Sequence, residues 1–126
     1  MKILLDTSVI IDHFRMKNNL LPSLVEQAEQ EKIEIILSSI VLFELWRGLS
    51  MKSATIRNDM ESFLSRFSVI SVDAAIATSA GDIERNGFSH GNDALIAACC
   101  LQERAKLATL NPNDFSRVPR LSLWKP

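Results

Sequence analysis

The chain has 126 residues, of which 47% are hydrophobic and 23% are charged, and its formal net charge is −1. This composition is ordinary for one soluble globular domain, and the length allows one substantial core. A net charge near zero excludes a protein that attracts nucleic acid by its overall field. Such a partner would need a local basic patch or bound cations.

No segment is typical of membrane insertion or secretion, so no membrane partner is expected. No apolar stretch approaches the roughly 20 residues that span a bilayer. Only three apolar residues separate Lys2 from Asp6, where a secretion signal has about 7–15. Cys99 and Cys100 are adjacent within an apolar run, which predicts small core residues and a chain at home in the reducing cytoplasm.

Short apolar runs alternate with helical patterns in the first half of the chain. Residues 2–5 are predicted to form a strand, and residues 8–16 and 22–31 to form helices, with Pro22 tolerated in a first turn. The run IEIIL at 33–37 is short and β-branched and predicts a second strand. SSIVLFELWRGL follows as a predicted helix, with a serine as N-cap and Gly48 near its end.

The second half repeats the alternation. In SATIRNDMESFLSRF, apolar residues recur at helical spacing as far as Phe67. SVISV predicts the third strand, and Asp73 then caps a helix that Gly87 ends. DALIAACCL is apolar all round, which predicts a helix buried on more than one side. LATL is a predicted strand, and LSL near the end is a candidate fifth.

This alternation predicts an α/β fold over residues 1–126 as a single domain. The expected architecture is a three-layer α/β/α sandwich with a mainly parallel central sheet of four to five strands. Ligands of open α/β sheets bind beyond the carboxyl ends of the strands. Four acids fall at or just past such ends: Asp6, Glu44, Asp93 and Asp114.

Taken singly, some of these acids have local explanations. Asp93 could be an acid that favours the helix dipole, and Asp114 could be a turn residue. Asp6 and Glu44 are harder to explain, because both stand in apolar surroundings. Asp12, one or two helical turns beyond Asp6, is expected either to line the same mouth or to face water.

The pieces LLDTSVIID, SSIVLFELWRGL, NDALIAA and LATLNPNDFSRVPRLSLW, in this order, resemble the PIN domain. Within that family they are similar to the VapC-type toxin ribonucleases of toxin–antitoxin pairs. The resemblance spans nearly the whole chain, and its four motifs together are specific. It implies that the four acids converge in one pocket as catalytic and metal-binding residues.

Such a pocket would need a cation. Two like charges about 4 Å apart repel by roughly 4 kcal/mol at an effective dielectric near 20, and a divalent ion offsets this repulsion. Oxygen-only ligands select Mg²⁺ or Mn²⁺ over zinc, and the resemblance suggests one or two ions. It also implies hydrolysis of RNA that leaves a 5′-phosphate and a 3′-hydroxyl.

Polar residues beside the acids are candidates for orienting the carboxylates: Thr7, Ser8, Thr109 and Asn111. Thr7 and Ser8 could equally just begin the first helix, and Asn111 could hold its loop or touch substrate. Candidate contacts to the RNA backbone, or simply solvated helix faces, are Arg15, Lys17 and Arg47.

The resemblance further implies a VapB-like antitoxin partner and a homodimer. An apolar groove near the first helices would take an antitoxin helix, with Phe14 and Trp46 as possible contacts, although Trp46 could instead belong to the core. Two other functions remain open. One is a PIN-like binding module without catalysis, which would have no reason to keep four acids. The other is an aspartate-nucleophile phosphatase, in which Ser8 stands where a second acid is usual.

Overall fold

The computed structural model describes residues 1–16, 18, 20–31 and 33–125. In this part of the chain, four parallel strands form one sheet in the order β3-β2-β1-β4. The strands are β1 (Lys2–Leu5), β2 (Glu34–Ser38), β3 (Ser68–Ile70) and β4 (Lys106–Ala108). The predicted mainly parallel α/β sheet is therefore confirmed.

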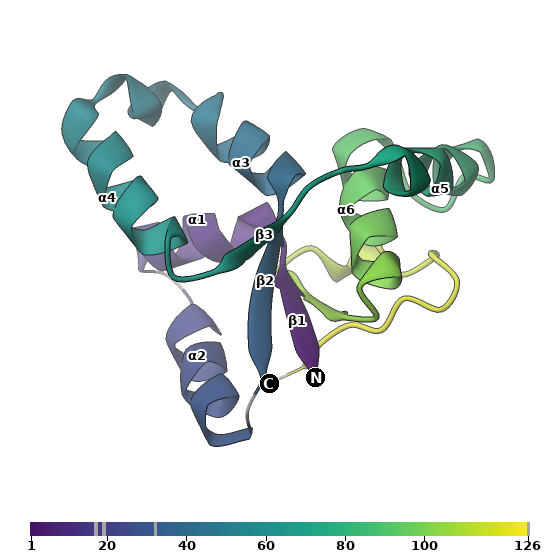
Figure 1. The fold of residues 1–126 in the computed structure, drawn as a ribbon, viewed down its shortest axis with the longest axis horizontal. Helices are drawn as coiled ribbons and strands as arrows, with labels where there is room; N and C mark the ends of the chain where they lie inside the picture. The colour runs from purple at the N-terminus through teal and green to yellow at the C-terminus, as the bar shows by residue number, and fades with distance from the viewer. Residues whose placement is uncertain (17, 19, 32, 126) are drawn as a thin grey trace.

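Helices cover both faces of this sheet. Figure 1 shows α1 and α2 on one side of the strands and α5 and α6 on the other, which is the predicted three-layer arrangement. Among the described residues, no helix has the length and apolar character that crossing a bilayer requires. The helices are α1 (Thr7–Arg15), α2 (Leu20–Glu31), α3 (Ser39–Trp46), α4 (Ala54–Leu64), α5 (Ala74–Arg85) and α6 (Gly91–Gln102), with short 3₁₀ helices η1 (Leu49–Lys52) and η2 (Pro112–Asp114).

The predicted helix caps are present. Ser38 caps α3, its Oγ accepting from the Ile40 N–H at 3.2 Å, and Asp73 caps α5, its Oδ1 accepting from the Ile76 N–H at 2.8 Å. Gly87 adopts φ 73° just after α5, a left-handed conformation that glycine reaches without a Cβ penalty.

Two predicted elements end differently from the expectation. The helix predicted to reach Phe67 stops at Leu64, because the Phe67 N–H donates back to the Leu64 carbonyl at 3.1 Å in a turn. The candidate fifth strand LSL does not form. Only Leu123 makes a bridge, to Leu107 of β4, and Arg120 just upstream is held in a left-handed turn with φ 67°.

The core lies on both sides of the sheet, and α6 is its most buried helix. Cys99 and Cys100 are free and buried there, as predicted for small core residues. The Cys100 Sγ donates to the Ala105 carbonyl at 3.0 Å, and burial raises the pKa of this thiol to about 12. The thiol is therefore protonated and unreactive at neutral pH.

Candidate functional site

Asp6 is buried where β1 passes into α1. Its backbone N–H donates to the Ala108 carbonyl at 2.9 Å, which continues the pairing of β1 with β4. Its Oδ1 accepts from the Thr7 N–H at 2.9 Å and so caps α1. Its Oδ2 accepts from the Ser8 hydroxyl at 2.9 Å and from the Thr109 hydroxyl at 2.7 Å. These donors offset the cost of burying a charged group.

Glu44 is held next to this position by the neighbouring helix. The Thr7 hydroxyl donates to Glu44 Oε1 at 2.8 Å, and the Arg47 guanidinium lies 3.6 Å from Glu44 Oε2. The Glu44 side chain is 16% exposed, so an acid amid apolar neighbours is largely covered yet keeps two polar partners. Thr7 thereby links the start of α1 to α3.

Asp93 lies in the first turn of α6, and the charges of the other three acids affect its pKa. Its pKa is raised from 3.8 to about 6, first by partial burial and then by the negative charges of Asp6, Asp114 and Glu44. Burial alone raises the pKa of a carboxyl group, and nearby like charges raise it further. The effect of these charges agrees with the predicted convergence of the four acids, of which Asp114 is exposed, and we call Asp6, Glu44, Asp93 and Asp114 the acid region.

This region does not already have the geometry of a coordination sphere. Within the described ranges, no three His, Cys, Asp or Glu side chains are grouped closely enough to hold a metal ion. Asp6 and Glu44 instead bind hydroxyls and a guanidinium. The donor set is nonetheless made only of oxygens, the ligands that Mg²⁺ and Mn²⁺ prefer. By charge and donor type, the acids fit a hard divalent cation.

The hydroxyls of Thr7, Ser8 and Thr109 donate to the carboxylates of Glu44 or Asp6. The hydroxyls of Ser8 and Thr109 also fix the loop after β4. Ser8 Oγ accepts from the Leu110 N–H at 3.0 Å, and Thr109 Oγ1 accepts from the Asn111 N–H at 3.0 Å. Asn111 thus reaches Asp6 only through Thr109. The loop geometry and the orientation of Asp6 are consequently coupled.

A buried serine that the sequence did not single out holds the segment of Asp114. The Ser89 hydroxyl donates to the Asp114 carbonyl at 3.1 Å, and Ser89 is buried. It connects the approach to α6, which carries Asp93, with η2. Its only sequence signal is its position shortly before α6, and that signal is weak.

Asp12 does not face water, which excludes one of the two alternatives expected for it. It is buried, and its Oδ1 accepts from the Asn18 backbone N–H at 3.0 Å and from Asn18 Nδ2 at 2.8 Å. Its role is to hold the chain after α1. Of the three basic candidates, Arg47 pairs with Glu44, Arg15 is exposed, and Lys17 lies outside the described residues.

An apolar groove adjoins the acids. We use this name for a cavity of about 600 Å³ between α1, α3, η1 and α4, lined among others by Ile11, Phe14, Glu44, Leu49, Met51 and Ile56. Ile11, Phe14, Leu49 and Ile56 are exposed, and so is Trp46 on the same helix as Glu44, so Trp46 is not a core residue. Exposed apolar patches of this kind mark interaction sites.

Comparison with known proteins assigns the chain to a family. The PIN domain family model matches residues 3–121, and the chain belongs to the PIN-domain family. The chain is 38% identical over 96 residues to ribonuclease VapC2 of Rickettsia felis, covering 71% of this chain and 72% of the relative. It is 32% identical over 126 residues to the tRNA(fMet)-specific endonuclease VapC of Shigella flexneri, covering 94% of this chain and 92% of the relative.

A solved structure agrees with this assignment. The VapBC2 complex of Rickettsia felis, bound to a DNA fragment from its promoter, matches with a TM-score of 0.79 and 31% identity. The match covers 99% of this chain and 100% of the solved chain. The recognition of a VapC-type PIN domain from its motifs is confirmed.

Proposed function

We propose that this protein is the toxin of a type II toxin–antitoxin system and acts as a metal-dependent endoribonuclease. The observation that carries the proposal is that Thr7 joins two of the candidate acids, its N–H donating to Asp6 Oδ1 at 2.9 Å and its hydroxyl to Glu44 Oε1 at 2.8 Å. The raised pKa of Asp93, caused first by burial and then by the charges of Asp6, Asp114 and Glu44, agrees with it. Crowded carboxylates of this kind are typical of sites that need a cation. The names of the VapC relatives support the choice of RNA as substrate.

Asp6, Glu44, Asp93 and Asp114 would together hold one or two Mg²⁺ or Mn²⁺ ions. When bound, such an ion neutralises the scissile phosphate and lowers the pKa of a bound water. Thr7, Ser8 and Thr109 fix the direction of the Asp6 and Glu44 carboxylates through the hydrogen bonds described above. Asp93 or Asp114 accepts the proton of the attacking water.

RNA cleavage tests the proposal. Labelled structured RNA is incubated with the parent, with Asp6→Asn and with Asp93→Asn, in Mg²⁺, in Mn²⁺ and in EDTA. We expect cleavage by the parent only with metal, and a loss of at least a hundredfold in both variants. Asp59→Asn, an exposed acid of α4, should cleave like the parent. A parent that cuts equally well in EDTA would contradict metal dependence, and one that never cuts would favour a binding module.

An antitoxin partner is the second part of the proposal. The matching solved chain was crystallised as a VapBC complex, and the apolar groove is exposed and flanked by Phe14 and Trp46. An amphipathic helix of a VapB-like antitoxin would bury these side chains. We also propose a homodimer, which light scattering would test, and a cytoplasmic location, which agrees with two free buried cysteines.

A further inference from the structure

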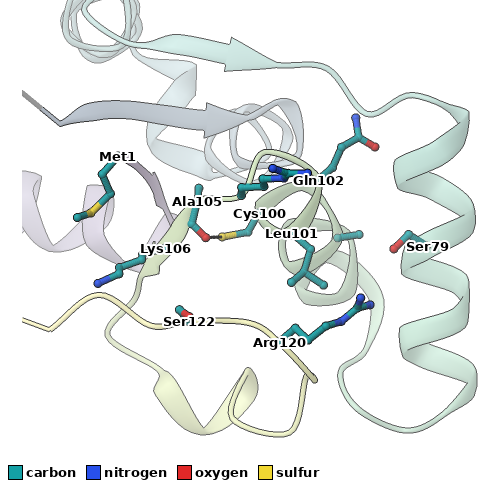
Figure 2. Close-up of a pocket in the computed structure, with 11 residues that line it drawn as sticks. Met1, Ser79, Cys100, Leu101, Gln102, Ala105, Lys106, Arg120 and Ser122 are labelled. Carbon is teal, nitrogen blue, oxygen red and sulfur yellow. Dashed lines mark hydrogen bonds between the residues drawn. The ribbon is translucent and has the colours of Figure 1, made fainter.

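A second cavity opens at the end of the sheet opposite to the acids. It measures about 630 Å³, and Met1, before β1, and Lys106, at the start of β4, contribute to its lining. Figure 2 shows Lys106 extending from β4, and Arg120 reaching from the C-terminal segment toward α6. We call the group of Arg104, Lys106 and Arg120 around this cavity the basic pocket.

The lining of the basic pocket carries positive charge, and its cations form no ion pair among the described residues. The lining contains three cationic side chains and no acidic one. Across the residues that the structure describes, ion pairs involve Lys2, Arg47 and Arg85 but none of these three. The acid beside them in sequence, Glu103, is paired with Lys2 at 3.1 Å. In a chain with a net charge of −1, this concentration of positive charge favours an anionic ligand.

The backbone at both arginines supports a role for their side chains. Arg104 has φ 53° and Arg120 has φ 67°, a left-handed region where glycine is favoured and other residues are uncommon. At Arg104 the N–H donates to the Leu101 carbonyl at 3.1 Å, the usual end of a helix. Glycine would satisfy this geometry with less strain. What arginine adds at each position is a guanidinium group at the pocket.

The lining favours phosphate over a nucleobase. It contains no aromatic ring on which a base could stack. It does contain two hydroxyls and an amide, from Ser79, Ser122 and Gln102, and such groups commonly donate to phosphate oxygens. Contacts of this kind hold a nucleic-acid backbone without reading its sequence.

We propose that the basic pocket binds backbone phosphates of the RNA substrate, an inference that rests on the proposed function. Without bound cations the acid region repels RNA, and the ions proposed there act on the scissile phosphate alone, so positive charge elsewhere on the molecule would strengthen the grip on the neighbouring phosphates. The strand β4 connects the two places: Lys106 begins it, and Thr109, which contacts Asp6, follows its end. Lys106 and Thr109 are three residues apart, a separation of about 10 Å along a strand. On the order of three nucleotides of a helical RNA strand have the same length.

Binding is measured in the full chain carrying Asp93→Asn, which prevents cleavage, by fluorescence anisotropy with a labelled RNA hairpin of about 20 nucleotides. Arg104→Gln with Arg120→Gln is expected to weaken binding at least tenfold. It should also reduce the slope of log K against log salt by about 1.5, because two phosphate contacts are lost. The matched control is Lys52→Gln with Arg66→Gln, which removes two exposed charges from the α4 side and should change affinity less than twofold.

The proposal would be overturned if Arg104→Gln with Arg120→Gln bound the hairpin with the same affinity and salt slope as the control variant. It would also be overturned if the protein carrying only Asp93→Asn did not bind RNA. A changed oligomeric state with unchanged RNA affinity would also overturn it, since the pocket would then be a protein interface. Arg104→Lys with Arg120→Lys keeps both charges and should keep the salt slope. If the Gln variant fails to fold, the Lys variant provides the test: a slope of log K against log salt lower than that of the protein carrying only Asp93→Asn would overturn the proposal.

Cleavage by the active protein separates this inference from the proposed function. Arg104→Gln with Arg120→Gln should raise KM for the hairpin and leave cleavage of a dinucleotide unchanged, because an RNA of two nucleotides is too short to span from the acid region to the pocket. If this variant cleaves the hairpin with an unchanged KM, the phosphate-binding role of the pocket is refuted and the proposed nuclease function stands. If the parent never cleaves RNA but binds it, and the binding is lost in this variant, the nuclease function is refuted and the phosphate-binding role of the pocket stands.

Discussion

Replacing Asp93 with Asn removes one of four crowded charges at nearly constant size, and its effect on stability should depend on both pH and metal. The pKa of Asp93 in the folded protein is raised from 3.8 to about 6. The folded protein therefore holds this proton more tightly than the unfolded chain does. Stability of the parent falls as pH rises between these two values and stays low above them.

The size of the effect follows from this raised pKa. Each pH unit between 3.8 and about 6 corresponds to about 1.4 kcal/mol, and full linkage would give about 3 kcal/mol at neutral pH. Asp93 is only half-buried, so water screens part of the repulsion, and about 1 kcal/mol is the expected gain for Asp93→Asn.

Urea unfolding measures this gain. In EDTA at pH 7.5, Asp93→Asn should be more stable than the parent by about 1 kcal/mol, and the difference should shrink at pH 4. With Mn²⁺ at a hundredfold excess over Kd, the parent gains about 2.7 kcal/mol and the variant gains less, so the order reverses. Asp59→Asn, exposed on α4, should match the parent throughout. A variant that is less stable than the parent in EDTA at pH 7.5 would refute the reasoning.

Three further substitutions probe other parts of the molecule. Thr109→Val removes the hydroxyl that donates to Asp6 at 2.7 Å, and should lower metal affinity, measured by calorimetry, about tenfold or more; unchanged affinity would argue against an orienting role. Leu4→Ala empties a fully buried site in β1 and should cost about 2–5 kcal/mol in urea unfolding. Ile11→Glu with Phe14→Glu places charges on exposed groove residues, and should abolish antitoxin binding in gel filtration without lowering Tm; retained binding would put the antitoxin elsewhere.

The fold was largely predictable because its signals are local. The buried strand β1 reads as a short apolar run, and the caps at Ser38 and Asp73 satisfy helix N–H groups within three residues. The early end of the helix at Leu64 rests on a local turn, whereas the missing fifth strand depends on a contact distant in sequence. The segment LSL looks like a strand, but only Leu123 bridges to β4, and nothing local marks how few residues will pair.

The membership of the candidate site stays a prediction, and the sequence did not indicate its hydrogen-bond geometry. Asp6 and Glu44 stood out as acids in apolar surroundings, and the raised pKa of Asp93 agrees with their convergence. Asp12 has the same appearance in sequence, but its partner Asn18 lies in the turn after α1, which no spacing rule identifies. The basic pocket was missed because Arg104 and Arg120 are exposed and 16 positions apart by their numbers, and single exposed arginines suggest only solvated surface.

The position of β4 at the edge of the sheet, next to β1, has a consequence for how the protein is made. Synthesis releases Asp6 and Glu44 early, but Asp93, Thr109 and Asp114 leave the ribosome many residues later. A growing polypeptide therefore lacks two of the four candidate site acids, Asp93 and Asp114, and the Thr109 hydroxyl that donates to Asp6. On the proposed function, the nascent chain lacks a complete site for RNA cleavage, and it can become active only after β4 has paired with β1.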